Sequence, residues 1–286
     1  MRWPVRLVLC VLGLAGAVTE DAHADTDWRE RIAVPMRAQV PEERLTQRVA
    51  PRFDELPEPR GAEDYEAERH APIIPEPMVF DLVRGLGARR GELEVNVLAL
   101  APLQRSDRRP VLWAPEIEWA VLDGVALEFE VPFEDTHLEA WKVAVQVTLG
   151  RDARRRFIHG LQAIGEAFDG VDHHELSLLY VPGYRWNETW SALALVGLRQ
   201  RFGDDVEDAT ELLINVSVFA DVGPRATLGL ELDFETDLGD AEAALLCMPQ
   251  VHVELTERFL LQAGVGARIE SSEVLPEVAA RAIFTP

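Results

Sequence analysis

The sequence has only two cysteines, Cys10 and Cys247, in its 286 residues. Cys10 lies in an N-terminal segment that we expect to be removed, which leaves Cys247 without a partner for an intramolecular disulfide. Long apolar runs are also scarce. After the N-terminus no segment approaches the roughly 18 consecutive apolar residues that indicate a membrane-spanning helix. Basic residues are outnumbered, since 28 Lys and Arg face 50 Asp and Glu, a net charge of −22 that argues against a nucleic-acid partner.

Catalytic signatures are missing as well. The chain holds no GxSxG, HExxH, phosphate-loop or dinucleotide-binding motif. The densest group of potential ligands is Asp172, His173, His174 and Glu175. Adjacent residues of a strand point to opposite faces, and no further Cys or His cluster completes a zinc set. We therefore expect no enzyme, no metal and no cofactor; a hydrolase with a site near His173 and His174 stays the alternative.

The first 24 residues have the three parts of a secretory signal peptide. Arg2 and Arg6 precede an apolar run from residue 7 to residue 18, and Ala22-His23-Ala24 forms a small-residue cleavage site. The run is too short for a transmembrane helix, which needs about 20 apolar residues. The sequence thus predicts export from the cytoplasm.

Residues 25–78 differ in composition from the rest of the chain. They hold eight of the eighteen prolines, many Arg and Glu residues, and no sustained hydrophobic period. Such a segment buries too little apolar surface to offset its ordering entropy. We expect a poorly ordered arm, followed by a second domain over residues 79–286.

From about residue 90 onward, apolar and polar residues alternate with period two. Ile117 and Trp119, for example, alternate with Glu116 and Glu118, and the pattern repeats along most of the chain. Side chains of a strand point alternately to opposite faces, so each segment has an apolar and a polar surface. The stretches near residues 156–168 and 174–182 alternate poorly. Twelve strands are predicted, near 91–101, 111–121, 125–134, 138–149, 156–168, 174–182, 188–200, 210–220, 225–236, 241–255, 258–270 and 274–284.

Lengths of about ten residues, an even count and short turns are typical of a transmembrane barrel. The predicted fold is all-β: an antiparallel up-and-down barrel of about twelve strands, with lipid against its apolar face. The connections after the second and tenth strands are short, whereas residues 102–110 and 201–210 form longer polar connections at the opposite end. A secreted soluble barrel or sandwich also alternates, but it buries its apolar face. The long apolar stripes favour the membrane barrel.

Two stretches carry a resemblance to known families. The C-terminal sequence EVAARAIFTP resembles the last strand of Gram-negative outer-membrane proteins, although Thr285 and Pro286 follow its aromatic residue, Phe284. The stretch EPMVFDLVRGLGARRGELEVNVLAL, with the later strands, resembles the MetA-pathway-of-phenol-degradation family of transporter-like barrels. That resemblance implies a passive outer-membrane channel for small, often apolar or aromatic compounds. It transfers no functional residue.

The polar face of the predicted strands should line the barrel lumen. Charged side chains there can set ion preference or hold a solute, or can form a salt-bridge network that closes the lumen. The candidate lumen-lining residues are Glu92, Glu94, Glu116, Glu118, Glu128, Glu130, Lys142, Arg199, Arg258 and Arg268, with Arg281 on the last strand.

The sequence therefore predicts an outer-membrane barrel that acts as a passive channel or transporter for small solutes, with its N-terminal arm in the periplasm. Its expected partners are outer-membrane lipid, the barrel assembly machinery and a small-molecule solute. The alternatives are a closed structural barrel, an outer-membrane enzyme and a secreted soluble barrel.

Overall fold

The structure is a computed structural model that describes residues 72–80, 82–103, 110–152, 154–239, 243–270 and 273–286. The predicted signal peptide and residues 25–71 of the predicted arm lie outside these ranges. Within them, no helix is long and apolar enough to cross a membrane.

Antiparallel strands account for most of the described chain. They are β1 (Leu93–Pro102), β2 (Leu112–Leu122), β3 (Val125–Glu130), β4 (Phe133–Glu134), β5 (His137–Leu138), β6 (Ala140–Arg151), β7 (Phe157–Phe168), β8 (His174–Arg185), β9 (Trp190–Phe202), β10 (Ala209–Gly223), β11 (Ala226–Asp237), β12 (Ala243–Thr256), β13 (Phe259–Glu270) and β14 (Glu273–Phe284).

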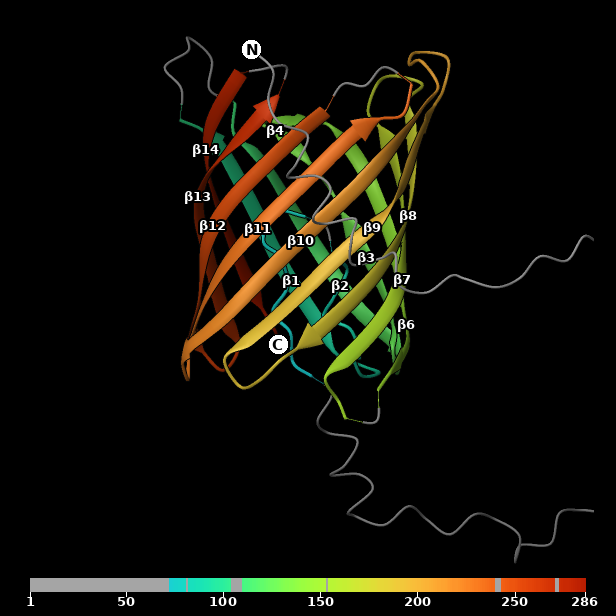
Figure 1. Cartoon of the computed structure of the whole chain (residues 1–286). Helices are drawn as coiled ribbons and strands as arrows, with labels where there is room; N and C mark the ends of the chain where they lie inside the picture. The colour runs from blue at the N-terminus through green and yellow to red at the C-terminus, as the bar shows by residue number, and fades with distance from the viewer. Residues whose placement is uncertain (1–71, 81, 104–109, 153, 240–242, 271–272) are drawn as a thin grey trace, which may run out of the picture. The chain divides into compact units, whose positions relative to one another are not determined.

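These strands form one sheet that closes on itself. Each long strand pairs with its neighbours in sequence, and β1 pairs with both β2 and β14. The two-residue strands β4 and β5 extend β3 and β6 at one end, because β4 pairs with the same edge of β2 as β3 does. The wall therefore has twelve strand positions, which confirms the predicted fold and strand count. Figure 1 shows how the strands surround the lumen.

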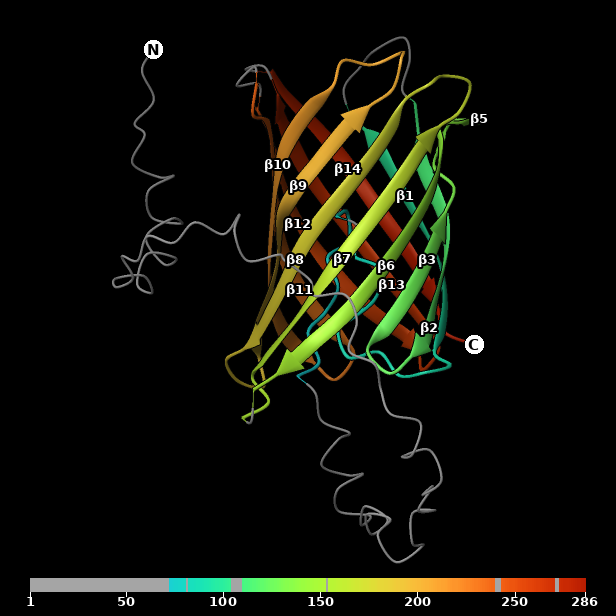
Figure 2. The same ribbon diagram turned by 90° about the vertical axis from the view of Figure 1, so that its right-hand side faces the viewer.

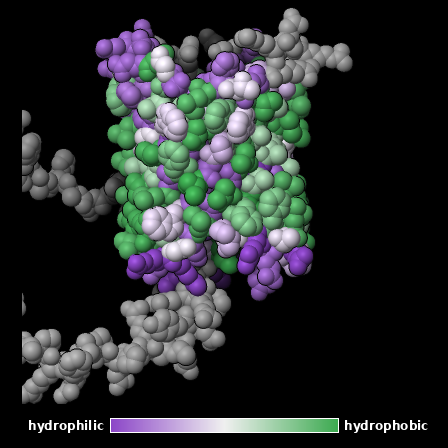
Figure 3. Space-filling view, turned by 180° about the vertical axis from the view of Figure 1, so that it is seen from behind, coloured by the Kyte–Doolittle hydropathy of each residue, from purple (hydrophilic) through white to green (hydrophobic). Residues whose placement is uncertain are grey.

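The period-two pattern of the sequence places apolar side chains outside and polar ones inside. Trp119, Val143 and Leu178 are about half exposed on the outer face, whereas Glu118 and Lys142 are buried on the inner face. Figure 3 shows the outer face as an apolar belt with hydrophilic residues concentrated towards the two ends. A closed barrel with such a belt satisfies every strand's backbone groups without water, as a bilayer requires.

The two ends of the barrel have different connections. At the terminal end, β1 begins and β14 ends, and Asp123 and Gly124 join β2 to β3 in a tight turn with a positive φ of 74° at the glycine. Residues 257–258 join β12 to β13 at the same end. At the far end, β9 and β10 are joined by residues 203–208. β1 ends and β2 begins at this end as well; most of the longer predicted connection between them, residues 104–109, lies outside the described chain.

Residues 72–92, apart from Asp81, form a segment that we call the luminal loop. It enters the lumen at the terminal end and returns there before β1 begins (Figures 1 and 2). At its deepest point Met78 contacts Leu246, Met248 and Glu231 in the middle of β12 and β11. Its return is fixed by hydrogen bonds from Gly87 N to Thr148 Oγ1 and from Arg90 N to Asp123 Oδ1, both 2.9 Å long. The composition of the sequence places residues 72–78 in the predicted arm and residues 79–92 in the predicted barrel domain. In the structure, the described residues of both ranges belong to the luminal loop.

Candidate functional site

The luminal loop packs against an apolar stripe on one half of the lumen wall. Leu82 and Val83 of the loop are fully buried against it, and Ile74, Phe80 and Leu86 add partly buried contacts. A loop with three or more large apolar side chains can stay in a barrel only if the wall offers apolar surface. The stripe consists of Ile164 on β7, Leu179 and Val181 on β8, Leu193 and Leu195 on β9, and Leu213 and Phe219 on β10, and it is extended by the small residues Ala126 on β3 and Ala144 on β6.

This stripe explains why two segments of the sequence alternate poorly. On β8, Leu178 is 60% exposed on the outer face, while its neighbour Leu179 is completely buried on the inner face. Both faces of β7, β8 and β9 are therefore apolar in part, the outer face for a lipid-like environment and the inner face for the loop. An alternation of apolar and polar residues cannot appear where both surfaces exclude water.

Glycines in the wall make room for the loop. A Cβ atom on Gly160 would lie 2.6 Å from Leu86 Cδ2, and one on Gly183 would lie 2.6 Å from Ile74 Cδ1. Likewise, a Cβ atom on Gly264 would lie 2.7 Å from Cε of Met78. Glycine within a strand often marks such a close approach of another chain segment, and these three residues mark the loop's path.

Polar wall residues bind the backbone of the loop. Val83 N donates to Gln162 Oε1 at 3.1 Å, and Gln146 Nε2 donates to the Arg84 carbonyl at 2.6 Å. The carboxylate of Glu231 accepts hydrogen bonds from three successive loop amides, those of Met78, Val79 and Phe80. Because the loop is outside the sheet, its N–H and C=O groups need such partners when they are buried.

The half of the wall opposite the stripe carries charge, and we call it the charged wall. Arg281 is its centre: Nη2 lies 2.5 Å from Glu116 Oε1 and 3.1 Å from Glu118 Oε1. Its Nε donates to Asn96 Oδ1 at 3.1 Å and its Nη1 to the Pro77 carbonyl of the loop at 3.3 Å. The other members are Glu94 on β1, Glu128 and Glu130 on β3, and Lys142 on β6.

Two more cations balance the carboxylates of the charged wall. Lys142 Nζ lies 2.6 Å from Glu130 Oε2, and both side chains are more than nine-tenths buried. Arg84 comes from the loop and forms ion pairs with Glu92 at 3.4 Å and Glu94 at 3.6 Å. Buried charges of this kind persist only when they are paired and hydrogen-bonded. The loop thus supplies part of the charge balance of the wall.

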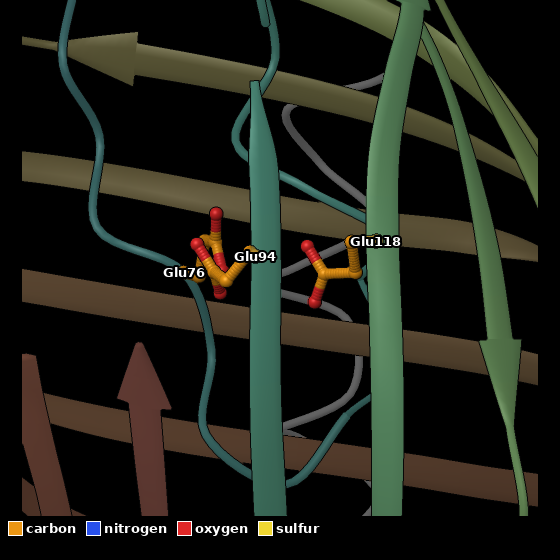
Figure 4. Close-up of side chains that lie close together, drawn as sticks. All are labelled: Glu76, Glu94 and Glu118. Carbon is orange, nitrogen blue, oxygen red and sulfur yellow. The ribbon is translucent and has the colours of Figure 1, made fainter. Parts of the chain in front are cut away.

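Three carboxylates meet where the loop crosses this wall. Glu76 of the loop, Glu94 and Glu118 each have an oxygen within 4.8 Å of the others (Figure 4). Glu116, Glu118 and Glu128 form a second group with the same spacing. Oxygen-only groups are the donors that Ca²⁺ and Mg²⁺ prefer. Here, however, the guanidinium groups of Arg281 and Arg84 already lie against the first group and supply positive charge.

The predicted lumen residues fall in three places. Glu94, Glu116, Glu118, Glu128, Glu130 and Lys142 are brought together on the charged wall, and Glu92 joins them at the terminal end through Arg84. Arg199 and Arg268 face inward nearer the far end, where each is half-buried in ion pairs. Arg258 is exposed in the turn between β12 and β13, so it lies at the mouth and not inside the barrel.

A second charged network fills the lumen nearer the far end. Arg199 pairs with Glu175 at 3.3 Å and with Glu211 at 3.1 Å, and Arg201 pairs with Glu211 at 3.2 Å and Asp237 at 3.0 Å. These side chains are 11–30% exposed. This part of the lumen is therefore wetter than the part around Arg281.

Sequence reasoning missed Glu231, the residue that makes most contacts with the loop backbone, and also Gln146 and Gln162. Each stands on the polar face of an alternating strand, as many other residues do. Three features of the sequence together could have indicated a segment inside the lumen. They are glycines within the strands, apolar residues on both faces of β8 and β9, and apolar residues in the proline-rich segment before β1.

His173 and His174 at the far end interact with neighbouring side chains. His173 Nε2 lies 3.2 Å from Glu175, and its ring stacks on Phe168 with 4.1 Å between centroids. His174 Nε2 lies 3.1 Å from Asp172. Among the residues that the structure describes, neither histidine belongs to a group of three side chains spaced to hold a metal ion.

Cavities flank the luminal loop. At the terminal end a cavity of about 600 Å³ is lined by Glu76 of the loop and by Arg185, His252 and Gln262 of the wall. A second, of about 310 Å³, lies beside Arg84. Beyond the loop, a pocket of about 110 Å³ touches Met78, Lys142 and Arg281. The loop therefore separates spaces that would otherwise belong to one lumen.

Comparison with known proteins supports the fold. A family profile described as HAEPLYID-like matches residues 70–150, which include the luminal loop and the first wall strands. No curated protein sequence matches the chain. Three solved structures share the architecture: the COG4313 outer membrane channel from Pseudomonas putida F1 (TM-score 0.58, 11% identity, 72% of this chain and 100% of that one), the NanC porin (0.54, 9%, 68% and 99%) and the KdgM porin (0.52, 9%, 67% and 98%).

Proposed function

We propose that the chain is an outer-membrane channel through which small solutes diffuse passively. The observation that carries the proposal is a closed twelve-strand barrel with an apolar belt outside and a charged, partly hollow lumen inside. The fold is shared with two porins and an outer membrane channel. A wall of paired charges beside open cavities is suited to guide polar groups through a bilayer.

The solutes in this proposal are small and apolar or aromatic, with a polar group. The apolar stripe and the charged wall face each other across the lumen, so a path that opens between them is amphipathic. Leu179 and Leu195 would contact the apolar part of a solute, while Lys142 and Arg281 would meet its polar part. A uniformly charged lumen would favour sugars or ions instead.

The same proposal includes the orientation of the barrel in the outer membrane. The signal peptide over residues 1–24 would direct export, and the barrel assembly machinery would recognise the last strand, in which Val278, Ala280, Ala282 and Phe284 alternate on the outer face. The terminal end would then face the periplasm, together with the arm that precedes the luminal loop. The far end, with Arg199 and His173, would face outward.

Swelling of proteoliposomes tests this function. The mature chain, reconstituted in liposomes, should admit benzoate-sized aromatic acids faster than sugars of similar mass, and empty liposomes should admit neither. The variant Leu82→Ser/Val83→Ser weakens the packing of the loop and should increase every rate. Absence of swelling and of single-channel conductance for both proteins, despite the heat-modifiable gel migration of a folded barrel, would indicate a closed structural barrel.

A further inference from the structure

Glu231 is a carboxylate in an unusual position. It stands in the middle of β11 on the lumen face and is completely buried. Its five hydrogen-bond donors among the described residues are all uncharged: three loop amides, Asn215 Nδ2 at 3.2 Å and Gln250 Nε2 at 3.1 Å. Most other buried carboxylates of the lumen have an Arg or Lys partner. An ionised group without a cation needs many hydrogen bonds to remain buried.

The loop supplies three of these five donors from three successive residues, and two of them make the shortest hydrogen bonds to Glu231. Met78 N lies 2.9 Å from Oε2, Val79 N 3.2 Å from the same oxygen, and Phe80 N 2.7 Å from Oε1. Both carboxylate oxygens are therefore bound to one turn of the loop. Asn215 and Gln250 hold the carboxylate from neighbouring strands β10 and β12, so its position is fixed by the wall even though its ligands come from the loop.

The contact lies where the loop reaches deepest. Met78 is buried against Leu246 and Met248 of β12, and Pro77 accepts a hydrogen bond from Arg281 of β14. Residues 77–80 are therefore held by β11, β12 and β14. A few residues further on, the backbone of Val83 and Arg84 is bound to Gln162 of β7 and Gln146 of β6 on the other side, so the loop spans the lumen.

We propose that Glu231 is the latch of the channel: it holds the luminal loop across the lumen and so is the positioning residue of the closed state. The inference rests on the proposed function, because a latch matters for transport only if the barrel conducts. Release of the loop removes three of the five donors from Glu231. Opening therefore requires that water or donor groups of a solute replace the amides of residues 78–80.

The test measures the loop and the conductance separately. Val83→Cys, introduced with Cys247→Ala, places a thiol at a completely buried loop position, and a membrane-impermeant maleimide reports its exposure. Glu231→Gln in this background keeps the shape but turns an acceptor oxygen into an amide that repels N–H donors. We expect maleimide labelling to accelerate on the order of tenfold or more, since hydrogen bonds to a charged acceptor are lost. Open probability in planar bilayers should rise in parallel.

Matched variants identify the cause. Glu235→Gln removes the same charge from the same face of β11, four residues from the latch; Glu235 lies 3.7 Å from Arg199 at the far end, so labelling of the loop should stay at the wild-type rate. Glu231→Asp keeps the charge but shortens the reach, so its labelling should be intermediate. If Glu231→Gln fails to give a folded, heat-modifiable barrel, Phe80→Pro removes a donor from the loop side and leaves the wall intact.

Labelling and open probability that remain at wild-type levels in folded Glu231→Gln and Phe80→Pro would overturn the latch. Faster labelling with no conductance in any variant would support the latch and refute the channel. Conductance that is equal in all variants, with slow labelling throughout, would support the channel and refute the latch.

Discussion

The two halves of the lumen wall are built on different principles. From β14 through β1 to β6 the inner face is charged, and Arg281 and Lys142 neutralise part of its glutamates. From β7 to β10 the inner face packs on the luminal loop with apolar residues, and it carries charge towards the far end, around Arg199 and Arg201. The comparison teaches that a polar lumen is not a requirement of the barrel: the inner face matches what it contacts, counter-charges on one side and apolar side chains of a peptide segment on the other.

The largest effect should come from the charged half. Arg281→Met removes the cation between Glu116 and Glu118 and leaves two buried carboxylates uncompensated, which typically costs about 3–5 kcal/mol. Urea unfolding of the protein in detergent, followed by tryptophan fluorescence, should show this loss. Arg268→Met is the control: its single ion pair with Glu277 is 4.0 Å long and partly exposed, so the loss should stay below about 1 kcal/mol.

Substitutions on the two faces of β8 should destabilise the protein in different ways. Leu178→Arg places a charge on the outer face, which costs about 2–4 kcal/mol near the middle of a bilayer. Leu179→Ala removes packing against the loop, and a buried Leu→Ala change costs about 2–5 kcal/mol where the site is rigid. We expect Leu178→Arg to reduce folding into liposomes, and Leu179→Ala to release the loop while the barrel still folds. Equal effects of both changes on folding would contradict the assignment of the inner apolar face to the loop.

The twelve strands were predictable from the sequence because alternation and turn chemistry are local signals. The outer face is identified by apolar residues such as Trp119 and Val143, which alternate with Glu118 and Lys142. A short turn then determines which face of the next strand points outward. The luminal loop was not predictable, because a proline-rich segment carries no period, and the partners of its backbone amides are far along the chain. Glu231 is more than 150 residues from Phe80.

The same reasoning explains the partial success at the site. Glutamates at every second residue of β2 and β3 identify the charged wall, because closely spaced like charges belong on a polar face. Nothing in the sequence indicates that Glu116 and Glu118 share Arg281, which comes from the far end of the chain and is brought beside β2 only because the barrel closes by the pairing of β1 with β14. Sequence patterns therefore locate the wall, whereas pairing across it depends on closure.

The smallest expected effect concerns ion preference. The described lumen has more carboxylates than cations, and charges in a narrow lumen are screened less than exposed ones. The open channel should therefore prefer cations. In a planar bilayer under a KCl gradient, Glu116→Gln, Glu118→Gln and Glu128→Gln together should move the reversal potential towards zero, since Arg281 and Lys142 then dominate the wall. An unchanged reversal potential would show that the charged wall does not line the conducting path.

Hydrogen exchange of the wild-type protein in lipid tests the central claim most directly, because it needs no substitution. The claim is that residues 77–80 and 82–84 lie inside the barrel and that the amides of residues 78–80 are bound to Glu231. Mass spectrometry should show that a peptide spanning these residues exchanges as slowly as peptides from β8 and β11, on the scale of hours. Exchange within seconds, as fast as in the exposed turn of residues 186–189, would contradict the account.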